Sequence, residues 1–280
     1  MFLQILILLV IIVLLLSGEW TRVERFVFNT DTFPYHIKDF RTLTKSAFIK
    51  CIQGDVPVLF QHAFDTKAFP AFTHLCNTFP NLPIKVRYGS YKTPSGRASR
   101  KFKTLTIREY CKHKHQYYGG NNRISAAQIY RLGVQPTASF LHHFPNGKLW
   151  IGTKGSRTPL HKDEPYNLSL QLFGHKQWTF FHRKDVQNLC YDKLNTRLEW
   201  SRYTLGDIAT CPRAKHAKKY VITVSPGEML YLPTQWSHDV SNLNDSVMVN
   251  FWFHRVSNLL EHTSQSCDKP SSRATLPRGS

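Results

Sequence analysis

Hydrophobic and polar residues alternate most regularly in the second half of the chain. Every second residue from Leu168 to Leu172 is apolar, and the alternation resumes with Trp178 and Phe180. Successive side chains of a β-strand point to opposite faces, so this period of two predicts strands. Gly174 stands between the two runs, where a tight turn is expected. The pattern therefore predicts two antiparallel strands joined near position 174.

Further strand and helix signals flank this pair. Pro226-Gly227 predicts a turn, and residues 229–232 predict the strand that follows it. Nearer the N-terminus, residues 56–61 (VPVLFQ) are typical of a strand. Residues 67–79 (KAFPAFTHLCNTF) have apolar residues at helical spacing, with Pro70 early in the run. We predict a mainly β protein with a mixed α/β segment before it.

The first residues of the chain are strongly apolar. Residues 2–16 are apolar apart from Gln4, which is shorter than the roughly 20 residues of a spanning helix and long for a signal-peptide core. Arg22 and Arg25 follow the run, and no Lys or Arg precedes it, which is unlike a plain secretory signal. We expect residues 1–20 to be a signal or a membrane anchor that acts through residues 2–18. The side of the membrane that the rest of the chain faces stays open.

The chain carries a large positive charge. Its net charge is +19, from 37 basic and 18 acidic residues, which predicts attraction to polyanions such as nucleic acid, an anionic membrane or an acidic protein. Simple solubility is the alternative explanation. Residues 85–115 hold ten Lys or Arg and one acid, Glu109, and residues 213–219 hold a second cluster. We expect a loop in 85–115 with a helix from about Thr106, and a basic rim made by both clusters.

Six cysteines are scattered without a Cys-x-x-Cys pair, which argues against a structural zinc site. Isolated buried thiols are the favoured interpretation, and disulfides are the alternative if the chain enters an oxidising compartment.

Three residues have the chemistry of a metal site. His161 and Asp163 are two apart, so they would leave the same face of a strand, and His238 follows the strand predicted at 229–232. Two histidines and one carboxylate form the facial triad of non-haem Fe(II) oxygenases, which leaves coordination positions open. Lys176 lies on the predicted return strand, where its ammonium could bind the far carboxylate of a dicarboxylate such as 2-oxoglutarate.

Several motifs around these residues resemble one family. They are Thr-Pro-x-His-x-Asp at 158–163, an Asn four residues later, Gly-x-Lys at 174–176, Pro-Gly-Glu at 226–228, Leu-Pro-x-x-Trp-x-His at 232–238 and Val-Asn-Phe-Trp at 249–252. Together they resemble the JmjC and cupin-8 group of Fe(II)/2-oxoglutarate oxygenases. The spacing from His161 to Lys176 is similar to that in the asparaginyl hydroxylase of hypoxia-inducible factor.

The resemblance implies a fold, cofactors and residue roles. The implied fold is a double-stranded β-helix, also described as a jelly-roll or cupin barrel, with an N-terminal α/β preface. The implied iron ligands are His161, Asp163 and His238, with 2-oxoglutarate and O2 as co-substrates. The residues implied to bind 2-oxoglutarate are Lys176, Thr158, Asn167, Asn250 and, as a weaker match, Tyr118.

The resemblance also suggests an organisation and a function. We expect a hydrophobic segment at 1–20, a preface at 21–134, a catalytic barrel at 135–256, and a short helix with a disordered tail at 257–280. The expected activity is a dioxygenase that hydroxylates a protein side chain. The alternatives are a hydroxylase that modifies tRNA or other RNA, a lysine demethylase, a small-molecule cupin enzyme with another metal such as Mn or Zn, and a catalytically silent binding module. The sequence leaves the oligomeric state open.

Overall fold

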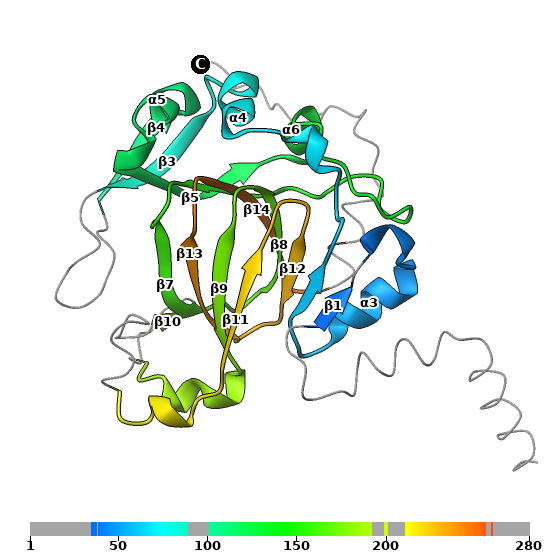
Figure 1. Cartoon of the computed structure of the whole chain (residues 1–280), viewed down its shortest axis with the longest axis vertical. Helices are drawn as coiled ribbons and strands as arrows, with labels where there is room; N and C mark the ends of the chain where they lie inside the picture. The colour runs from blue at the N-terminus through cyan, green and yellow to red at the C-terminus, as the bar shows by residue number, and fades with distance from the viewer. Residues whose placement is uncertain are drawn as a thin grey trace, which may run out of the picture.

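Two β-sheets face each other and form the body of the protein (Figure 1). The structure is a computed structural model, and it describes residues 35–37, 39–88, 101–191, 199–200, 211–255 and 259. The strands of the larger sheet are β1 (Tyr35–Ile37), β2 (Val58–Phe60), β3 (Pro83–Tyr88), β4 (Phe102–Thr106), β5 (Tyr117–Ile124), β6 (Gly147–Gly152), β8 (Tyr166–Phe173), β12 (Met229–Leu232) and β14 (Ser246–Phe253). Those of the smaller sheet are β7 (Arg157–Lys162), β9 (Lys176–Phe181), β10 (Glu199–Trp200), β11 (Lys219–Val224) and β13 (Ser237–Asn242).

The larger sheet has the order β1-β2-β12-β8-β14-β6-β5-β3-β4, and the smaller one has the order β10-β7-β13-β9-β11. Apart from the parallel pair β1–β2, the strand pairs are antiparallel. Two facing antiparallel sheets whose strands alternate between them are the architecture of a jelly roll. The predicted mainly β, cupin-like barrel is therefore confirmed.

Short helices lie around the sheets. They are the α-helices α3 (Lys45–Gln53), α4 (Phe72–Thr78), α5 (Ile107–Lys112) and α6 (Ala126–Arg131), and the 3-10 helices η1 (Phe40–Thr42), η2 (Thr66–Ala68), η3 (Lys114–Gln116), η4 (Arg183–Asn188) and η6 (Ala214–His216). The predicted helix of residues 67–79 begins only at Phe72, after Pro70. Helix α5 begins where it was predicted, because Thr106 and Glu109 form a reciprocal capping box.

The strand β8 divides its side chains between two cores. Leu168, Leu170 and Leu172 face outward and pack with the preface, in a cluster that includes Phe48 and Leu75. The opposite face carries Asn167, Ser169 and Gln171, which are all buried inside the barrel. The apolar residues of the alternating pattern therefore face the preface, while the polar residues line the barrel interior.

Gly174 makes the turn between β8 and β9. It has a φ of +70°, and a Cβ at this position would lie 1.9 Å from the carbonyl oxygen of Asp245. Only glycine fits both the left-handed backbone and this close approach, so the sequence signal and the structure agree.

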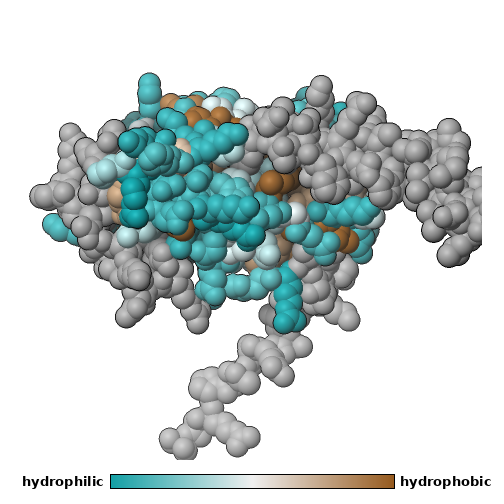
Figure 2. Space-filling model, turned by 90° about the horizontal axis from the view of Figure 1, so that it is seen from below, coloured by the Kyte–Doolittle hydropathy of each residue, from teal (hydrophilic) through white to brown (hydrophobic). Residues whose placement is uncertain are grey.

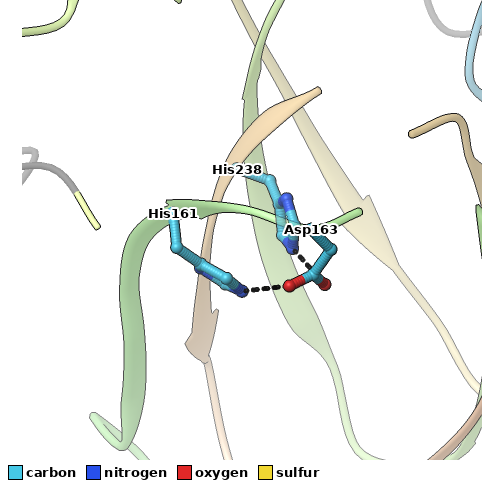
Figure 3. Close-up of side chains that lie close together, drawn as sticks. All are labelled: His161, Asp163 and His238. Atoms are coloured by element: carbon cyan, nitrogen blue, oxygen red, sulfur yellow. Dashed lines mark ion pairs between the residues drawn. The ribbon is translucent and has the colours of Figure 1, made fainter. Parts of the chain in front are cut away.

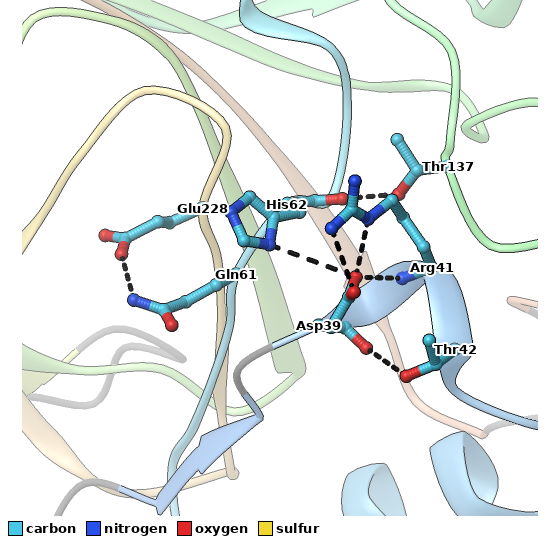
Figure 4. A network of polar contacts seen from close by, with 7 residues as sticks. All are labelled: Asp39, Arg41, Thr42, Gln61, His62, Thr137 and Glu228. Carbon is cyan, nitrogen blue, oxygen red and sulfur yellow. Dashed lines mark hydrogen bonds and ion pairs between the residues drawn. The ribbon is translucent and has the colours of Figure 1, made fainter.

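A polar network ties the preface to the barrel (Figure 4). The carboxylate of Asp39 accepts hydrogen bonds from the Arg41 side chain, while Gln61 donates to Glu228 at 3.1 Å. The hydroxyl of Thr137 donates to the carbonyl of His62. These bonds fix the segment after β2 against the turn that leads into β12.

One prediction about the preface needs correction. Residues 85–115 were expected to be a loop up to about Thr106, but the described parts form the antiparallel pair β3 and β4. The expected domain boundary between 134 and 135 is crossed by the larger sheet, because β5 pairs with β6. The preface strands therefore extend the barrel sheet, and the boundary itself stays a prediction.

The interpretation of the cysteines as isolated thiols is also wrong for four of them. Cys76 in α4 is bonded to Cys111 in α5, and Cys190 is bonded to Cys211. Among the described residues Cys51 is a free cysteine, and burial raises the pKa of its thiol to about 11. Sequence spacing could not reveal these pairs, because each depends on how distant segments pack.

The expected membrane segment, residues 2–18, and the expected tail lie outside the described residues. Among the residues that the structure does describe, none of the helices has the length and apolar character needed to cross a bilayer.

The double variant Cys76→Ser/Cys111→Ser is expected to lose about 3 to 4 kcal/mol of unfolding free energy, because the bridge closes a loop with a sequence separation of 35 residues. Urea denaturation with and without a thiol reductant measures this loss. The Cys51→Ala variant is the control, and it should respond to the reductant as the wild type does. A wild-type protein whose unfolding midpoint does not change on reduction would contradict the prediction.

Candidate metal and co-substrate site

The three predicted metal ligands converge inside the barrel. Figure 3 shows both imidazole rings pointing toward the carboxylate of Asp163. The Nε2 atom of His161 lies 3.8 Å from Oδ1 of Asp163, and Nε2 of His238 lies 3.8 Å from Oδ2. One ligand atom from each residue can be chosen so that all three lie within 4.8 Å of one another. All three side chains are buried.

Strand pairing explains this convergence. His161 in β7 and His238 in β13 are direct partners in the antiparallel pair, and their ring centroids are 4.1 Å apart. A register shift follows between His238 and Val240. Asp163 is the first residue after β7 ends, and its carbonyl accepts a hydrogen bond from the backbone of Gln235 at 2.9 Å. This bond holds the end of β7 against the loop that leads to His238.

The second nitrogen of each imidazole faces a backbone carbonyl. Nδ1 of His161 lies 2.7 Å from the carbonyl oxygen of Pro159, and Nδ1 of His238 lies 3.0 Å from that of Trp236. A carbonyl accepts only a proton donor, so we assign the proton of each ring to Nδ1. Nε2 then carries the lone pair, which is the form that a metal ligand requires.

The electrostatics of the three groups fit a divalent cation. Burial, reinforced by the nearby His161, lowers the pKa of His238 to about 4, so its ring is neutral at pH 7. Asp163 Oδ1 is buried and has no hydrogen-bond partner within the described part of the chain. A buried carboxylate oxygen without a partner is costly, and coordination to a metal would remove that cost. Two neutral imidazoles and one carboxylate suit Fe(II) and leave coordination positions open.

Lys176 lies further along the same sheet. It pairs with Asn242 of β13, and its ammonium donates to the Asn242 side chain at 2.7 Å. The side chain is 1% exposed, and no carboxylate among the described residues forms an ion pair with it. Burial lowers the pKa of this amine to about 7. An anion that reached it would restore its charge.

Tyr118 and Thr158 form one polar pair of the expected co-substrate pocket. Their hydroxyl oxygens are 2.9 Å apart, and both side chains are buried. Burial raises the pKa of Tyr118, so the hydroxyl stays protonated and can donate a hydrogen bond. Thr158 pairs with Val240 of β13, two residues before the partner of Lys176. The weaker prediction, Tyr118, is thus in contact with a stronger one.

Asn167 and Asn250 form a second polar group on the opposite sheet. The amide of Asn250 donates to Asn167 at 3.2 Å and accepts from the indole of Trp150 at 2.8 Å. Ser169 donates to the same oxygen of Asn167 at 3.1 Å. These contacts orient both amides inside the barrel, where they would line a ligand pocket.

Sequence reasoning missed several residues around the site. Asn242, the partner of Lys176, is four residues after His238 and therefore on the same face of its strand, which was a usable signal. Trp178 stacks on His238 with ring centroids 5.6 Å apart. The orienting carbonyls of Pro159 and Trp236 leave no sequence signal, because every residue has a carbonyl.

Most of the chain is similar in sequence to one protein family. The sequence profile described as "Cupin-like domain" matches residues 47–259. The chain is 34% identical over 137 residues to "JmjC domain-containing protein C" of Dictyostelium discoideum. The aligned region covers 44% of this chain and 32% of that protein. It is also 32% identical over 114 residues to "HSPB1-associated protein 1" of Rattus norvegicus. This aligned region covers 37% of this chain and 23% of that protein.

A third relative is "Jumonji C domain-containing protein 5" of Drosophila melanogaster, 32% identical over 108 residues, with coverage of 38% of this chain and 27% of that protein. The matches thus span between 23% and 32% of the length of these three curated relatives.

Mn(II), a redox-stable substitute for Fe(II), is expected to raise the thermal midpoint of the wild type by roughly 5 to 10 °C at about a hundredfold excess over its dissociation constant. Asp163→Ala should abolish this rise, because it removes the single carboxylate of the triad. The exposed His216 provides the control variant His216→Ala, which should keep it.

Without metal, Asp163→Ala should melt no lower than the wild type, because the variant loses a buried, unpaired oxygen. A lower midpoint of the metal-free variant would instead indicate a structural role for Asp163. Differential scanning calorimetry measures both effects.

Proposed function

The chain belongs to the JmjC and cupin-8 family, whose Cupin-like domain covers most of it, and from this premise we propose that it is an Fe(II)- and 2-oxoglutarate-dependent dioxygenase. The reaction that we propose is hydroxylation of a protein side chain. The family generally consists of oxygenases but also has inactive members, so the argument for activity depends on the residues of this chain.

One observation carries the proposal. The barrel interior holds a triad with an unpaired carboxylate oxygen and, further along the same sheet, a buried lysine without an acidic partner among the described residues. A silent binding module would have no need for a buried carboxylate oxygen and a buried amine that both lack partners of opposite charge, because burying each costs free energy. A divalent metal would pair with the first and a dicarboxylate with the second.

We assign the residues the following tasks. His161, Asp163 and His238 would hold Fe(II), with the imidazoles oriented by the carbonyls of Pro159 and Trp236. Bound Fe(II), 2-oxoglutarate and O2 would together supply the oxidising chemistry, with succinate and CO2 as co-products.

The chain's own polar side chains would position the co-substrate. Lys176 would bind its distal carboxylate, and the Tyr118–Thr158 pair would add hydroxyl donors beside that group. Asn167 and Asn250 would contribute amide groups from the opposite sheet. Trp178, which stacks on His238, would help to exclude water from the metal.

Anaerobic addition of Fe(II) and 2-oxoglutarate is expected to produce the weak visible absorption of an iron-bound 2-oxo acid. His161→Ala should abolish the band. Lys176→Met should weaken 2-oxoglutarate binding by about thirtyfold or more, because it removes the buried cation that would pair with the distal carboxylate.

The matched control is 2-oxopentanoate, which lacks the distal carboxylate. It should bind the wild type and Lys176→Met about equally. A wild-type protein that binds Mn(II) but gives no band with Fe(II) and 2-oxoglutarate would support the silent module. If Lys176→Met lost affinity for 2-oxoglutarate and 2-oxopentanoate equally, the result would indicate general damage to the pocket.

Binding of 2-oxoglutarate should weaken as the pH rises above 7. The amine of Lys176 has a pKa of about 7 in the ligand-free protein, so above this pH it is mostly neutral and must take up a proton to pair with a carboxylate. We expect the dissociation constant to rise by about tenfold or more between pH 7 and pH 9. Calorimetry in buffers of different ionisation enthalpy should detect the proton uptake.

The same shift predicts how the ligand-free protein responds to pH. The unfolded chain keeps the ordinary pKa of lysine, so between about pH 7 and the ordinary value it binds more protons at this site than the folded chain does. The contribution of Lys176 to the unfolding free energy should therefore increase with pH in this window. Lys176→Met should lose both the proton uptake and this increase.

A further inference from the structure

Four cations share one face of the larger sheet where it extends beyond the barrel. Lys85 and Arg87 lie two apart on β3, and Arg123 of β5 is the direct partner of Lys148 of β6. Arg87 is in turn the partner of Tyr118, which points into the barrel. Lys148 is two residues before Trp150, which packs in the barrel core, so alternation along β3 and β6 places all four side chains on the barrel-facing side of the sheet. We call these four residues the cation face.

The cation face carries charge that the described residues do not neutralise. Lys85 and Arg123 are exposed, and Arg87 and Lys148 are half-buried. None of the four forms an ion pair with an acid in the part of the chain that the structure describes. Phe102 of β4 lies beside them and is 44% exposed, with the Lys85 ammonium 4.6 Å from its ring centre.

This face is continuous with the pocket proposed for 2-oxoglutarate. The guanidinium of Arg87 lies 5.7 Å from the ring centre of Tyr118. Lys148 is the direct cross-strand partner of Asn250. Opposite residues of an antiparallel pair have Cβ atoms about 5 Å apart, so a ligand on the cation face would lie beside the pocket wall. The second basic cluster, residues 213–219, lies elsewhere.

In Figure 1 the helix η6 and the start of β11, which carry that second cluster, are at the end of the molecule opposite β3 and β4. That end is seen directly in Figure 2, and its surface is mainly hydrophilic. Among the described residues, the cations of β3 and β4 and those of η6 and β11 therefore lie at opposite ends of the molecule, and the basic rim that joins both clusters stays a prediction. The cation face is the cluster in contact with residues of the proposed pocket.

We propose that the cation face binds an acidic segment of the protein substrate and directs a neighbouring residue to the active site. This inference rests on the proposed function. Lys85 and Arg87 are about 7 Å apart along the strand, which matches carboxylates at alternate positions of an extended peptide. Arg123 and Lys148 extend the same charge toward Asn250.

The two disulfides favour a polypeptide over RNA as the ligand. Disulfides such as Cys76–Cys111 and Cys190–Cys211 persist in oxidising compartments and are rare in the cytosol and nucleus, where RNA substrates are found. Acidic protein segments occur in both environments. RNA binding is therefore an alternative result of the experiment below.

The experiment measures binding of a fluorescein-labelled Asp-Gly-Ser repeat peptide by anisotropy, with an Asn-Gly-Ser repeat as the neutral probe and poly-uridine of equal charge as the RNA probe. The charge reversal Lys85→Glu/Arg123→Glu is expected to raise the dissociation constant of the acidic peptide by roughly tenfold or more, because two attractions become repulsions. The control variant Lys215→Glu/Lys218→Glu changes the net charge by the same amount at the opposite end of the molecule. It should raise the dissociation constant of the acidic peptide less than twofold.

Each other result overturns the inference in a distinct way. An equal loss of peptide affinity in the two double variants would mean that binding depends only on the net charge of the protein. Tighter binding of poly-uridine, lost in Lys85→Glu/Arg123→Glu, would make the face a nucleic-acid surface. The 2-oxoglutarate absorption band of the wild type is measured on the same preparation. A band without peptide binding refutes the cation face alone, whereas peptide binding without a band refutes the dioxygenase alone.

Discussion

The antiparallel pairing of β7 with β13 is the constraint on which the site depends. It sets His161 directly opposite His238, and the pairing of β13 with β9 sets Asn242 opposite Lys176. Because β13 lies between these two neighbours, its register is fixed from both sides. A slip by one residue would turn every inward side chain outward. The placement of the candidate metal triad and that of the lysine proposed to bind the co-substrate thus both depend on the register of one strand.

The interior that this register creates is unusually polar for a buried space. Its hydroxyls and amides are largely paired with one another, as in the Tyr118–Thr158 contact. Two ionisable groups are exceptions among the described residues, because Oδ1 of Asp163 has no hydrogen-bond partner and Lys176 has no carboxylate partner. Burying such groups opposes folding, and the outward leucines of β8, packed on the preface, help to offset that cost. The preface is therefore part of what makes a charged barrel interior tolerable.

Local features of the fold were predictable from sequence, whereas features that depend on pairing at a distance were not. The turn at Gly174 and the start of α5 near Thr106 are encoded within a few residues, and both were found where expected. The three candidate ligand residues were predicted from motifs, yet their orienting carbonyls have no signature in the sequence. The β3–β4 pair was mistaken for a loop because its many cations outweighed a short alternation, in which Ile84 and Val86 are buried between exposed neighbours. The disulfides require knowledge of which helices pack together.

The net charge is another property of the sequence whose structural consequence depends on the fold. A value of +19 predicts attraction to anions but does not say where an anion would bind. The fold places the cation face and the described cations of 213–219 at opposite ends of the molecule, and Arg87 and Lys148 adjoin Tyr118 and Asn250 of the proposed pocket. Charge beside the pocket can orient a bound chain relative to the reacting atoms, while charge at the other end can only raise the encounter rate. The position of these cations beside the proposed pocket, and not the net charge itself, therefore supports an acidic segment as part of the proposed substrate.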